Sequence, residues 1–510
     1  MESFLKRHAS QIAGHLSCLD RVVITGTLPE LCYREGMMHY LLTHNIPFYD
    51  FPDWAATWRE KIRDCAETEA RQAGLEIQFV RDRRQRKEEI VRRILQERGT
   101  QPGLVAILSA MESCPTYRPQ RDRQSGRRWL KGDSGKCLHY YFYLIDPWLG
   151  LTYLRVPTWA PFGLQFYFNG HGALERALAG RRQKPRFCDN ALVATSDWSA
   201  TQQIADELIE PARLHRTLED YARRFCPPAR ELAPDGYHWS LSQVELSTDL
   251  IFRGPQALSP LYEELARTAI LSVKVDDVAT FLNRPIHPLM RQEIANRFDL
   301  QVQGRRIRHQ MGEASIKMYD KFGFILRVET TTIDVTFFRH HRRVEHKDGT
   351  WEMKVAPMRK TIYSLPDLVG LMRAANERYL EHLAAIEDPA PRLKELDRLS
   401  RPEREGDGRS SRGFNLFDDE DLELCQALLR GEFTISGLRN RHLQGLLGKT
   451  GHQVSHLLKR LRLHGLLKKV GRTYKYYLTQ LGQRVVAAGV RLRQTLVIPA
   501  LELQPAEVRF

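Results

Sequence analysis

The sequence predicts a multidomain protein with an α/β and α+β body and a C-terminal winged helix-turn-helix domain. Strands and helices alternate in the first third, antiparallel strand pairs follow, and three helical stretches precede a hairpin near the end. The 510 residues suffice for about three or four domains. We expect an α/β domain with basic loops and an aromatic-rich hairpin, a helical connector, an α+β domain with antiparallel strands, a linker and the winged domain, at residues 1–180, 181–236, 237–387, 388–412 and 413–500.

Short apolar strands separated by helical stretches open the chain. Asp20 begins "DRVVITGTL", Leu75 begins "LEIQFV" and Gly103 begins "GLVAILSAM". This alternation is typical of an α/β layer with a largely parallel sheet. Residues 118–136 are rich in Arg and Lys and predict a basic loop. No function for residues 1–180 follows from these patterns.

Aromatic residues crowd two predicted strands, residues 137–145 and 151–156, which flank the turn sequence "DPWLG". Alternate aromatics fill the core of a sheet, but aromatics among cations also stack on the bases of single-stranded nucleic acid. Both interpretations stay open for these strands. Trp159 and Phe162, which lie beside two prolines, are the better candidates for stacking on a base.

The middle of the chain places acidic residues on predicted strands. A strand from Ser240 carries Glu245 and Asp249, and a later strand pair carries Tyr319 and Glu329. In that pair, the phrases "IKMYDK" and "LRVETT" resemble those of plasmid and phage rolling-circle replication initiators. The resemblance covers about a fifth of the chain.

In that family a tyrosine attacks a DNA phosphate while acidic side chains hold a divalent ion. The resemblance implies Mg²⁺ or Mn²⁺, although the His-hydrophobe-His motif of the better-known initiators is absent from this sequence. The candidate catalytic residues are Tyr319, Glu329, Asp249 and Glu245. In the alternative interpretation, Lys317, Arg327 and Glu329 form a structural charge ladder across neighbouring strands.

Two further polar patterns allow other chemistry. Asp20 and Asp146 lie at ends of predicted strands and would pair as metal ligands in a nuclease of the ribonuclease-H class, but such aspartates are also ordinary turn formers. Residues 339–347 hold three histidines among four cations, and this field opposes a divalent ion. We expect a phosphate contact or a solvated loop there, leading into a hairpin that turns at Asp348 and Gly349.

A charged segment with Pro, Gly and Ser, residues 388–412, predicts the linker. Beyond it, helices are predicted at residues 418–429 and 436–447. Residues 433–501 hold thirteen Lys and Arg and no Asp or Glu, so this segment carries thirteen of the formal +15 charges. Such a field favours a polyanion, and a nucleic-acid backbone is the commonest one.

The pattern after this point predicts a recognition helix and a wing. Thr450 caps a helix with one apolar stripe, Gly465 ends it, and a hairpin with a basic tip follows. The run "TGHQVSHLLKRLRLHGLLKKVGRTYKYYLTQLG" resembles MarR-like winged-helix modules, which implies a helix in the DNA major groove and a wing on the backbone. The implied base readers are His452, Gln453, Ser455, His456 and Lys459. The implied phosphate contacts are Lys449, Arg460, Lys469, Arg472 and Lys475.

The sequence argues against several classes. The phrase "GDSGKC" lacks the spacing of a phosphate loop, and no glycine fingerprint for dinucleotides follows a strand, so we expect no nucleotide cofactor. The eight cysteines include no Cys-x-x-Cys pair, which argues against zinc fingers. No apolar run approaches the roughly 20 residues of a membrane span, and no signal-peptide core follows the start, so we expect a cytoplasmic protein without a membrane partner.

Three classes of function remain. The first is a DNA-binding protein of a mobile or replicating element, whose body contacts single-stranded DNA or RNA and acts as a metal-dependent nuclease or initiator-like strand transferase. The second is a MarR-like transcriptional regulator with a large sensing domain, and the third is an RNA-binding protein of a ribonucleoprotein. Basic patches spread along the body favour the first class. MarR-like modules are usually dimeric, and residues 485–497 would supply a pairing helix for a homodimer.

Overall fold

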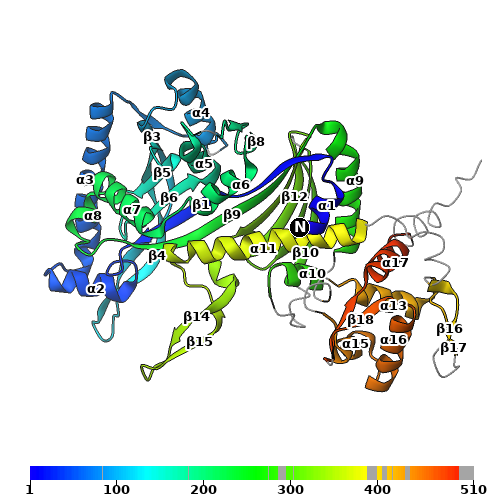
Figure 1. The fold of residues 1–510 in the computed structure, drawn as a ribbon. Helices are drawn as coiled ribbons and strands as arrows, with labels where there is room; N and C mark the ends of the chain where they lie inside the picture. The colour runs from blue at the N-terminus through cyan, green and yellow to red at the C-terminus, as the bar shows by residue number, and fades with distance from the viewer. Residues whose placement is uncertain are drawn as a thin grey trace, which may run out of the picture. The chain divides into compact units, whose positions relative to one another are not determined.

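The structure is a computed structural model that describes residues 1–492 except residues 83, 182, 274, 285–293, 302–303, 388–398, 405–409, 416, 431–432, 434–436 and 472. The chain divides into two compact units, and Figure 1 shows their elements. The first unit comprises Met1–His15, Thr248–Thr330 and Leu371–Phe510. The second unit comprises Leu16–Ser247 and Thr331–Gly370. Helices and strands occur in both units, so the protein is of mixed α and β class.

Eleven strands form one sheet in the order β10-β11-β12-β13-β9-β1-β6-β5-β4-β3-β2. Three neighbouring strands contribute residues to both units: β13 (Ile325–Thr332), β9 (His238–Phe252) and β1 (Ile12–Thr27). Much of each strand is buried on both faces. A polar side chain on these strands therefore needs a polar partner, because burying it alone is costly.

Short connections make most of the second unit's sheet antiparallel. Strands β3 (Gly103–Arg121), β4 (Arg128–Asp146), β5 (Gly150–Pro157) and β6 (Leu164–Asn169) pair antiparallel in succession, and β6 pairs antiparallel with β1. By contrast, β2 (Ile77–Phe79) runs parallel to β3. The prediction of a largely parallel sheet is therefore wrong. A turn of a few residues joins antiparallel neighbours, whereas a parallel pair needs a long crossover.

The basic residues at 118–136 are also not a loop. The pairing of β3 with β4 continues to Arg121 and Arg128, so most of this segment is a long hairpin. Backbone pairing of the two strands leaves the cationic side chains on the hairpin surface. Arg118, for example, pairs with Asp133 at 2.9 Å and remains largely exposed.

The aromatic residues of these strands fill the core. Tyr141, Tyr143 and Tyr153 are buried in one apolar cluster, so these three side chains fill the core of the sheet, as the first of the two interpretations predicts. Phe162 is fully buried, and the indole nitrogen of Trp159 donates to the hydroxyl of Thr116 at 2.8 Å. The prediction that Phe162 stacks on a base is therefore wrong, because no base can reach a buried ring.

Helix α3 of the second unit is amphipathic and packs by its apolar face. In α3 (Phe51–Ala73) the buried residues recur every three or four positions, and Gly74 ends the helix in the left-handed region, with φ of 64°. The segment 181–236, predicted as a helical connector, contains three helices and two short strands among its described residues. The other elements are α2 (Arg34–Thr43), η1 (Phe48–Asp50), α4 (Lys87–Arg98), α5 (Gly170–Leu178), β7 (Arg186–Phe187), β8 (Leu192–Ala194), α6 (Trp198–Asp206), α7 (Pro211–Phe225) and α8 (Pro227–Glu231).

A small separate sheet belongs to the same unit. Strands β14 (Arg339–Glu345) and β15 (Trp351–Pro357) pair antiparallel, between the short helices η3 (Val335–Phe337) and η4 (Ile362–Ser364). The predicted hairpin is therefore confirmed. Its turn contains Gly349, whose φ of 80° suits glycine.

The body part of the first unit combines helices with an antiparallel meander. Strands β10 (Ile294–Gln301), β11 (Gly304–Met311) and β12 (Ala314–Lys321) pair in succession. The antiparallel character predicted for this region is confirmed. The helices are α1 (Glu2–Arg7), α9 (Pro255–Ser272), α10 (Val275–Phe281) and α11 (Leu365–Glu387), of which α11 begins in the second unit.

The C-terminal part has helices and a hairpin where the sequence predicts them. Residues 388–398 and 405–409 of the predicted linker lie outside the described residues, as do residues 493–497 of the predicted pairing helix. Leucines of three helices share one core with Val485. The elements are β16 (Glu403–Arg404), β17 (Ser410–Ser411), α13 (Asp419–Leu428), α15 (Asn440–Leu447), α16 (Gly451–Leu463), β18 (Leu467–Lys469), β19 (Tyr476–Leu478) and α17 (Gln480–Leu492).

Candidate functional site

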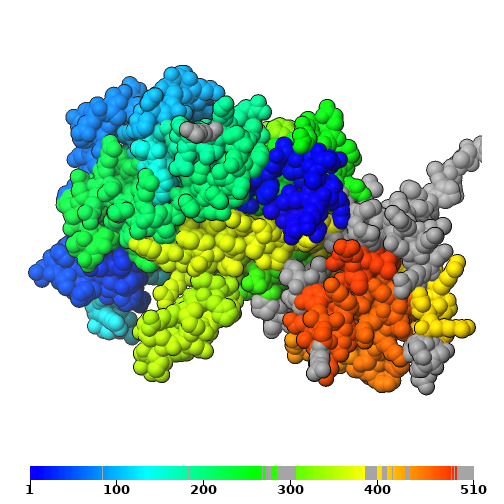
Figure 2. Space-filling model, in the orientation of Figure 1, coloured from blue at the N-terminus to red at the C-terminus, as the bar shows by residue number. Residues whose placement is uncertain are grey.

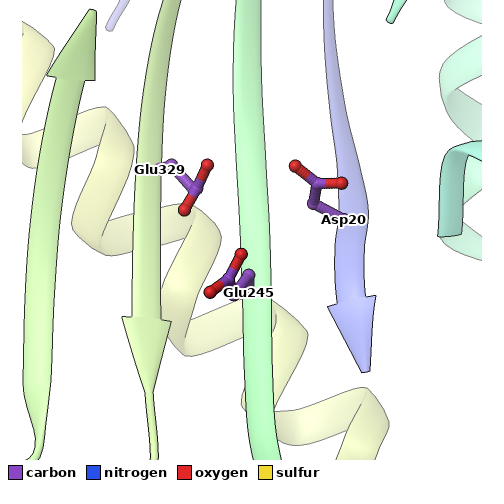
Figure 3. A group of neighbouring side chains, drawn as sticks. All are labelled: Asp20, Glu245 and Glu329. Atoms are coloured by element: carbon purple, nitrogen blue, oxygen red, sulfur yellow. The ribbon is translucent and has the colours of Figure 1, made fainter. Parts of the chain in front are cut away.

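Three carboxylates gather on three neighbouring strands (Figure 3). Asp20 comes from β1, Glu245 from β9 and Glu329 from β13, and a carboxylate oxygen of each lies within 4.8 Å of one from each of the others. Asp20 and Glu329 are buried and Glu245 is half-buried. We call these residues the carboxylate cluster. Because like charges so close repel, the arrangement favours a bound cation or a shared proton.

Amide side chains orient the Asp20 carboxylate. The amide nitrogens of Asn169 and Asn190 donate to Asp20 Oδ1 at 2.8 and 2.7 Å. The carbonyl oxygen of Asn169 is itself fixed, because it caps α5 and accepts from the backbone N–H of His171 at 2.8 Å. Glu245 is oriented in a similar way by Gln243, whose amide nitrogen donates to Glu245 Oε1 at 2.9 Å. These neutral donors fix the orientation of two carboxylates without neutralising their negative charge.

Glu329 has a cation and a phenol beside it. Lys317 Nζ lies 2.6 Å from Glu329 Oε1, and the Tyr319 hydroxyl donates to Glu329 Oε2 at 2.9 Å. Lys317 and Tyr319 are two residues apart on β12, so their side chains leave the same face of the strand. The structure thus brings two predicted catalytic residues, Tyr319 and Glu329, into direct contact.

Asp249 has a different role from the one predicted. Its carboxylate accepts two hydrogen bonds from the Arg327 guanidinium, at 2.6 and 2.7 Å, and both side chains are fully buried. The paired geometry uses both carboxylate oxygens and excludes water. Asp249 therefore stabilises the fold, and we remove it from the catalytic set. The charge ladder proposed as the alternative is observed in part, as the pairs Lys317 with Glu329 and Arg327 with Asp249.

Sequence reasoning paired Asp20 with the wrong residue. Asp146 accepts from the backbone N–H groups of Trp148 and Leu149 at 2.7 and 2.8 Å, and from the Tyr221 hydroxyl. It is the turn former between β4 and β5, so the proposed pairing of Asp20 with Asp146 is wrong. One signal for Asp20 was present, since it is an acidic residue inside an apolar strand sequence and so requires a polar environment.

The C-terminal part presents most of its predicted contact residues on the surface. On α16, His452, Ser455, His456 and Lys459 are exposed. The Ser455 hydroxyl also donates to Gly451 O at 2.8 Å, and the rings of His452 and His456 lie 4.7 Å apart. These side chains form one polar face on the helix.

Other predicted contacts in this part have structural partners. Thr450 and Gln453 form a reciprocal capping box at the start of α16. Lys449 lies 3.4 Å from Glu420. Lys469 is exposed beside the Tyr474 ring, whereas Lys475 is half-buried. Arg472 lies outside the described residues.

Arg460 requires a correction. Its guanidinium is buried and donates two hydrogen bonds to Asp421, at 2.9 and 2.8 Å, while Cζ lies 3.7 Å from the centre of the Phe414 ring. Another guanidinium nitrogen donates to Gly413 O at 2.7 Å. In this position Arg460 joins α16 to α13 and is not available to a phosphate. We remove it from the predicted contact set.

Comparisons with known proteins place few limits on this chain. No protein-family model and no curated protein matches it. One solved structure, a rolling circle replication initiator protein from Geobacillus stearothermophilus, is similar over 71% of this chain and 97% of its own, at 9% identity and a TM-score of 0.20. A likeness of this degree carries no conclusion about activity. Among the described residues, no helix has the length and apolar character needed to cross a membrane.

Proposed function

We propose that the protein binds DNA and cleaves a DNA strand at the carboxylate cluster with the help of a divalent metal ion. The observation that carries this proposal is the approach of three carboxylates from three adjacent strands to within 4.8 Å. Rigid strands hold such groups more accurately than loops do. Two of the three are buried, and Lys317 offsets the charge of Glu329, so a bound cation would offset the negative charge that remains in the cluster.

The residues present fit a hard cation. The cluster offers only carboxylate oxygens, the donors that Mg²⁺ and Mn²⁺ prefer, and no thiol or imidazole that would favour zinc. Asn169 and Asn190 would act as outer partners that fix the orientation of Asp20. When bound, such an ion stabilises the charge that develops on a phosphate.

Tyr319 is the candidate nucleophile. Its hydroxyl already donates to Glu329, so Glu329 is placed to accept the proton when the oxygen attacks phosphorus. The tyrosine oxygen would form a bond to phosphorus, and the bond from phosphorus to one sugar oxygen would break. That oxygen would leave as a hydroxyl group after taking a proton from water, and one strand end would stay attached to the protein.

A nicking assay tests the proposal. Supercoiled and end-labelled single-stranded DNA are incubated with protein and Mg²⁺ or Mn²⁺ and resolved on denaturing gels. We expect metal-dependent nicks that disappear in Glu329→Gln and Asp20→Asn, and a protein-linked strand that disappears in Tyr319→Phe. Asp133→Asn, a partly exposed carboxylate on the β3–β4 hairpin, is the matched control. Nicking that persists in Glu329→Gln would overturn the proposal.

We also propose that residues 413–492 act as a winged-helix DNA-binding domain. The supporting observation is the polar face of α16 beside a β18–β19 hairpin, in a segment without acidic residues from 433 to 501. His452, Ser455, His456 and Lys459 would face the bases, and Lys469 would contact phosphate. This function does not depend on the carboxylate cluster, so binding without cleavage would leave it intact.

A further inference from the structure

The β14–β15 hairpin stands apart from the main sheet of its unit. It is a two-stranded sheet by itself, and Figures 1 and 2 show it as a protruding arm. Its register pairs Arg343 with Met353 and His341 with Val355. The tip is tied by a hydrogen bond from His346 N to Thr350 O at 2.9 Å. The arm is therefore an ordered ribbon with a defined outer face.

The two faces of the ribbon differ in exposure. On one face, Ala356 is buried and His340 lies 3.4 Å from Asp367 at the start of α11. On the other face, Trp351, Met353 and Val355 are 47%, 66% and 46% exposed. Large apolar side chains that share one exposed face indicate an interaction surface, because exposing them together is unfavourable without a partner.

Cations accompany this apolar face. The Arg343 guanidinium lies 4.0 Å from the centre of the Trp351 ring, and His341 is exposed beside Val355 in the register. Residues 339–360 contain seven Lys and Arg against three Asp and Glu. A partner with dense negative charge is therefore complementary to the ribbon and its base.

We propose that the β14–β15 ribbon inserts into a groove of double-stranded DNA, with Arg343, Met353 and Val355 facing the base pairs. The major groove, about 12 Å wide, admits a two-stranded ribbon. A guanidinium matches the acceptors of guanine, and apolar side chains pack against thymine methyl groups. This inference rests on the proposed DNA function, but it assigns contact with the duplex to an element separate from both the carboxylate cluster and the C-terminal helices.

Binding by the full-length protein tests the assignment. Fluorescence anisotropy is measured without divalent metal, using a duplex and a single strand of equal length, so that a failure of the cleavage proposal does not affect the result. Arg343→Ala with Met353→Ala removes one cation and one apolar side chain from the outer face. Lys354→Ala is the control, because it removes one cation from the opposite face of the same strand pair.

We expect the double variant to bind the duplex about tenfold more weakly, with the control within about twofold of the natural protein. A photocrosslinking amino acid incorporated at Met353 should attach to the duplex, which tests contact even if the double variant unfolds. Unchanged duplex affinity, an equal loss in Lys354→Ala, or weakening confined to the single strand would overturn the proposal. Crosslinking to a protein instead of the duplex would also overturn it.

Discussion

A buried arginine–aspartate pair is present both in the strands of the carboxylate cluster and in the C-terminal part of the chain, yet the remaining charges of these two regions are arranged differently. Arg327 with Asp249 stabilises the strands, and Arg460 with Asp421 joins α16 to α13. On the same two strands and on β1, three further carboxylates converge, and two of them are buried.

In the C-terminal part, several other cations lie on the surface, as Lys459 does. Converging buried charges select a compact counter-ion, because desolvation makes the interaction strong and local. Surface charges stay hydrated and suit an extended polyanion. The buried arginine–aspartate pairs stabilise the fold, whereas the clustered carboxylates and the surface cations are candidates for contact with a ligand.

The largest expected effect comes from breaking the buried pairs. Asp249→Ala leaves the Arg327 guanidinium buried without its carboxylate and should lower the free energy of unfolding by about 3–5 kcal/mol. Asp421→Ala should also lower it, because Arg460 loses both hydrogen bonds to that carboxylate, although it keeps those to the backbone carbonyls of Arg412 and Gly413. Urea unfolding monitored by hydrogen exchange at each site measures both.

Replacing the first pair with Asp249→Leu and Arg327→Met is the control. It should recover most of the loss, since two apolar residues leave no buried charge. If Asp249→Ala instead costs less than about 1 kcal/mol, Asp249 is not a structural residue and returns to the list of catalytic candidates.

A buried histidine should make the free energy of unfolding depend on pH. Burial lowers the pKa of His309 to about 4 from its ordinary value of 6.5, and the nearby His382 adds to this shift. Between pH 6.5 and about 4 the unfolded chain binds a proton that the folded chain does not, so stability should fall as pH drops through this range. The loss reaches about 3 kcal/mol, and unfolding curves at successive pH values measure it.

His309→Gln should flatten this pH dependence, because glutamine does not titrate in this range. A pH dependence that persists in His309→Gln would exclude His309 as its source.

Stabilisation by a metal ion should depend on the carboxylate cluster and not on a carboxylate elsewhere on the surface. At a Mn²⁺ concentration one hundredfold above Kd, the ion should stabilise the protein by about 2.7 kcal/mol. Asp20→Asn should abolish this stabilisation, and Asp133→Asn should preserve it. Thermal melts with and without Mn²⁺, together with calorimetric titration, provide the measurement. Stabilisation that survives Asp20→Asn would place the ion elsewhere.

The smallest effect concerns one surface cation. Lys459→Ala should weaken DNA binding severalfold and reduce the slope of log affinity against log salt by about 1. Lys6→Ala, which removes an exposed cation from α1, should change neither quantity. A salt titration of anisotropy distinguishes these outcomes. An unchanged slope in Lys459→Ala would exclude that side chain as a phosphate contact.

The sequence by itself determined the local elements. Spaced leucines and the Thr450 cap located α16, and the turn at Asp348 and Gly349 located the β14–β15 hairpin, because both signals depend on residues close along the chain. The acidic character of Glu245 and Glu329 on strands was also readable, as was the clustering of cations near the C-terminus. Their identity as candidate ligands was therefore predictable.

Only the tertiary structure decided which charges meet. Asp20 lies beside Glu245 and Glu329 although more than 200 residues separate it from either. Asp249 and Arg460 were equally plausible site residues from the sequence, but both form buried ion pairs. Strand order cannot be read from local patterns, because pairing between distant strands depends on the packing of the whole sheet. A charged side chain binds a ligand or stabilises the fold according to the partners that this packing supplies.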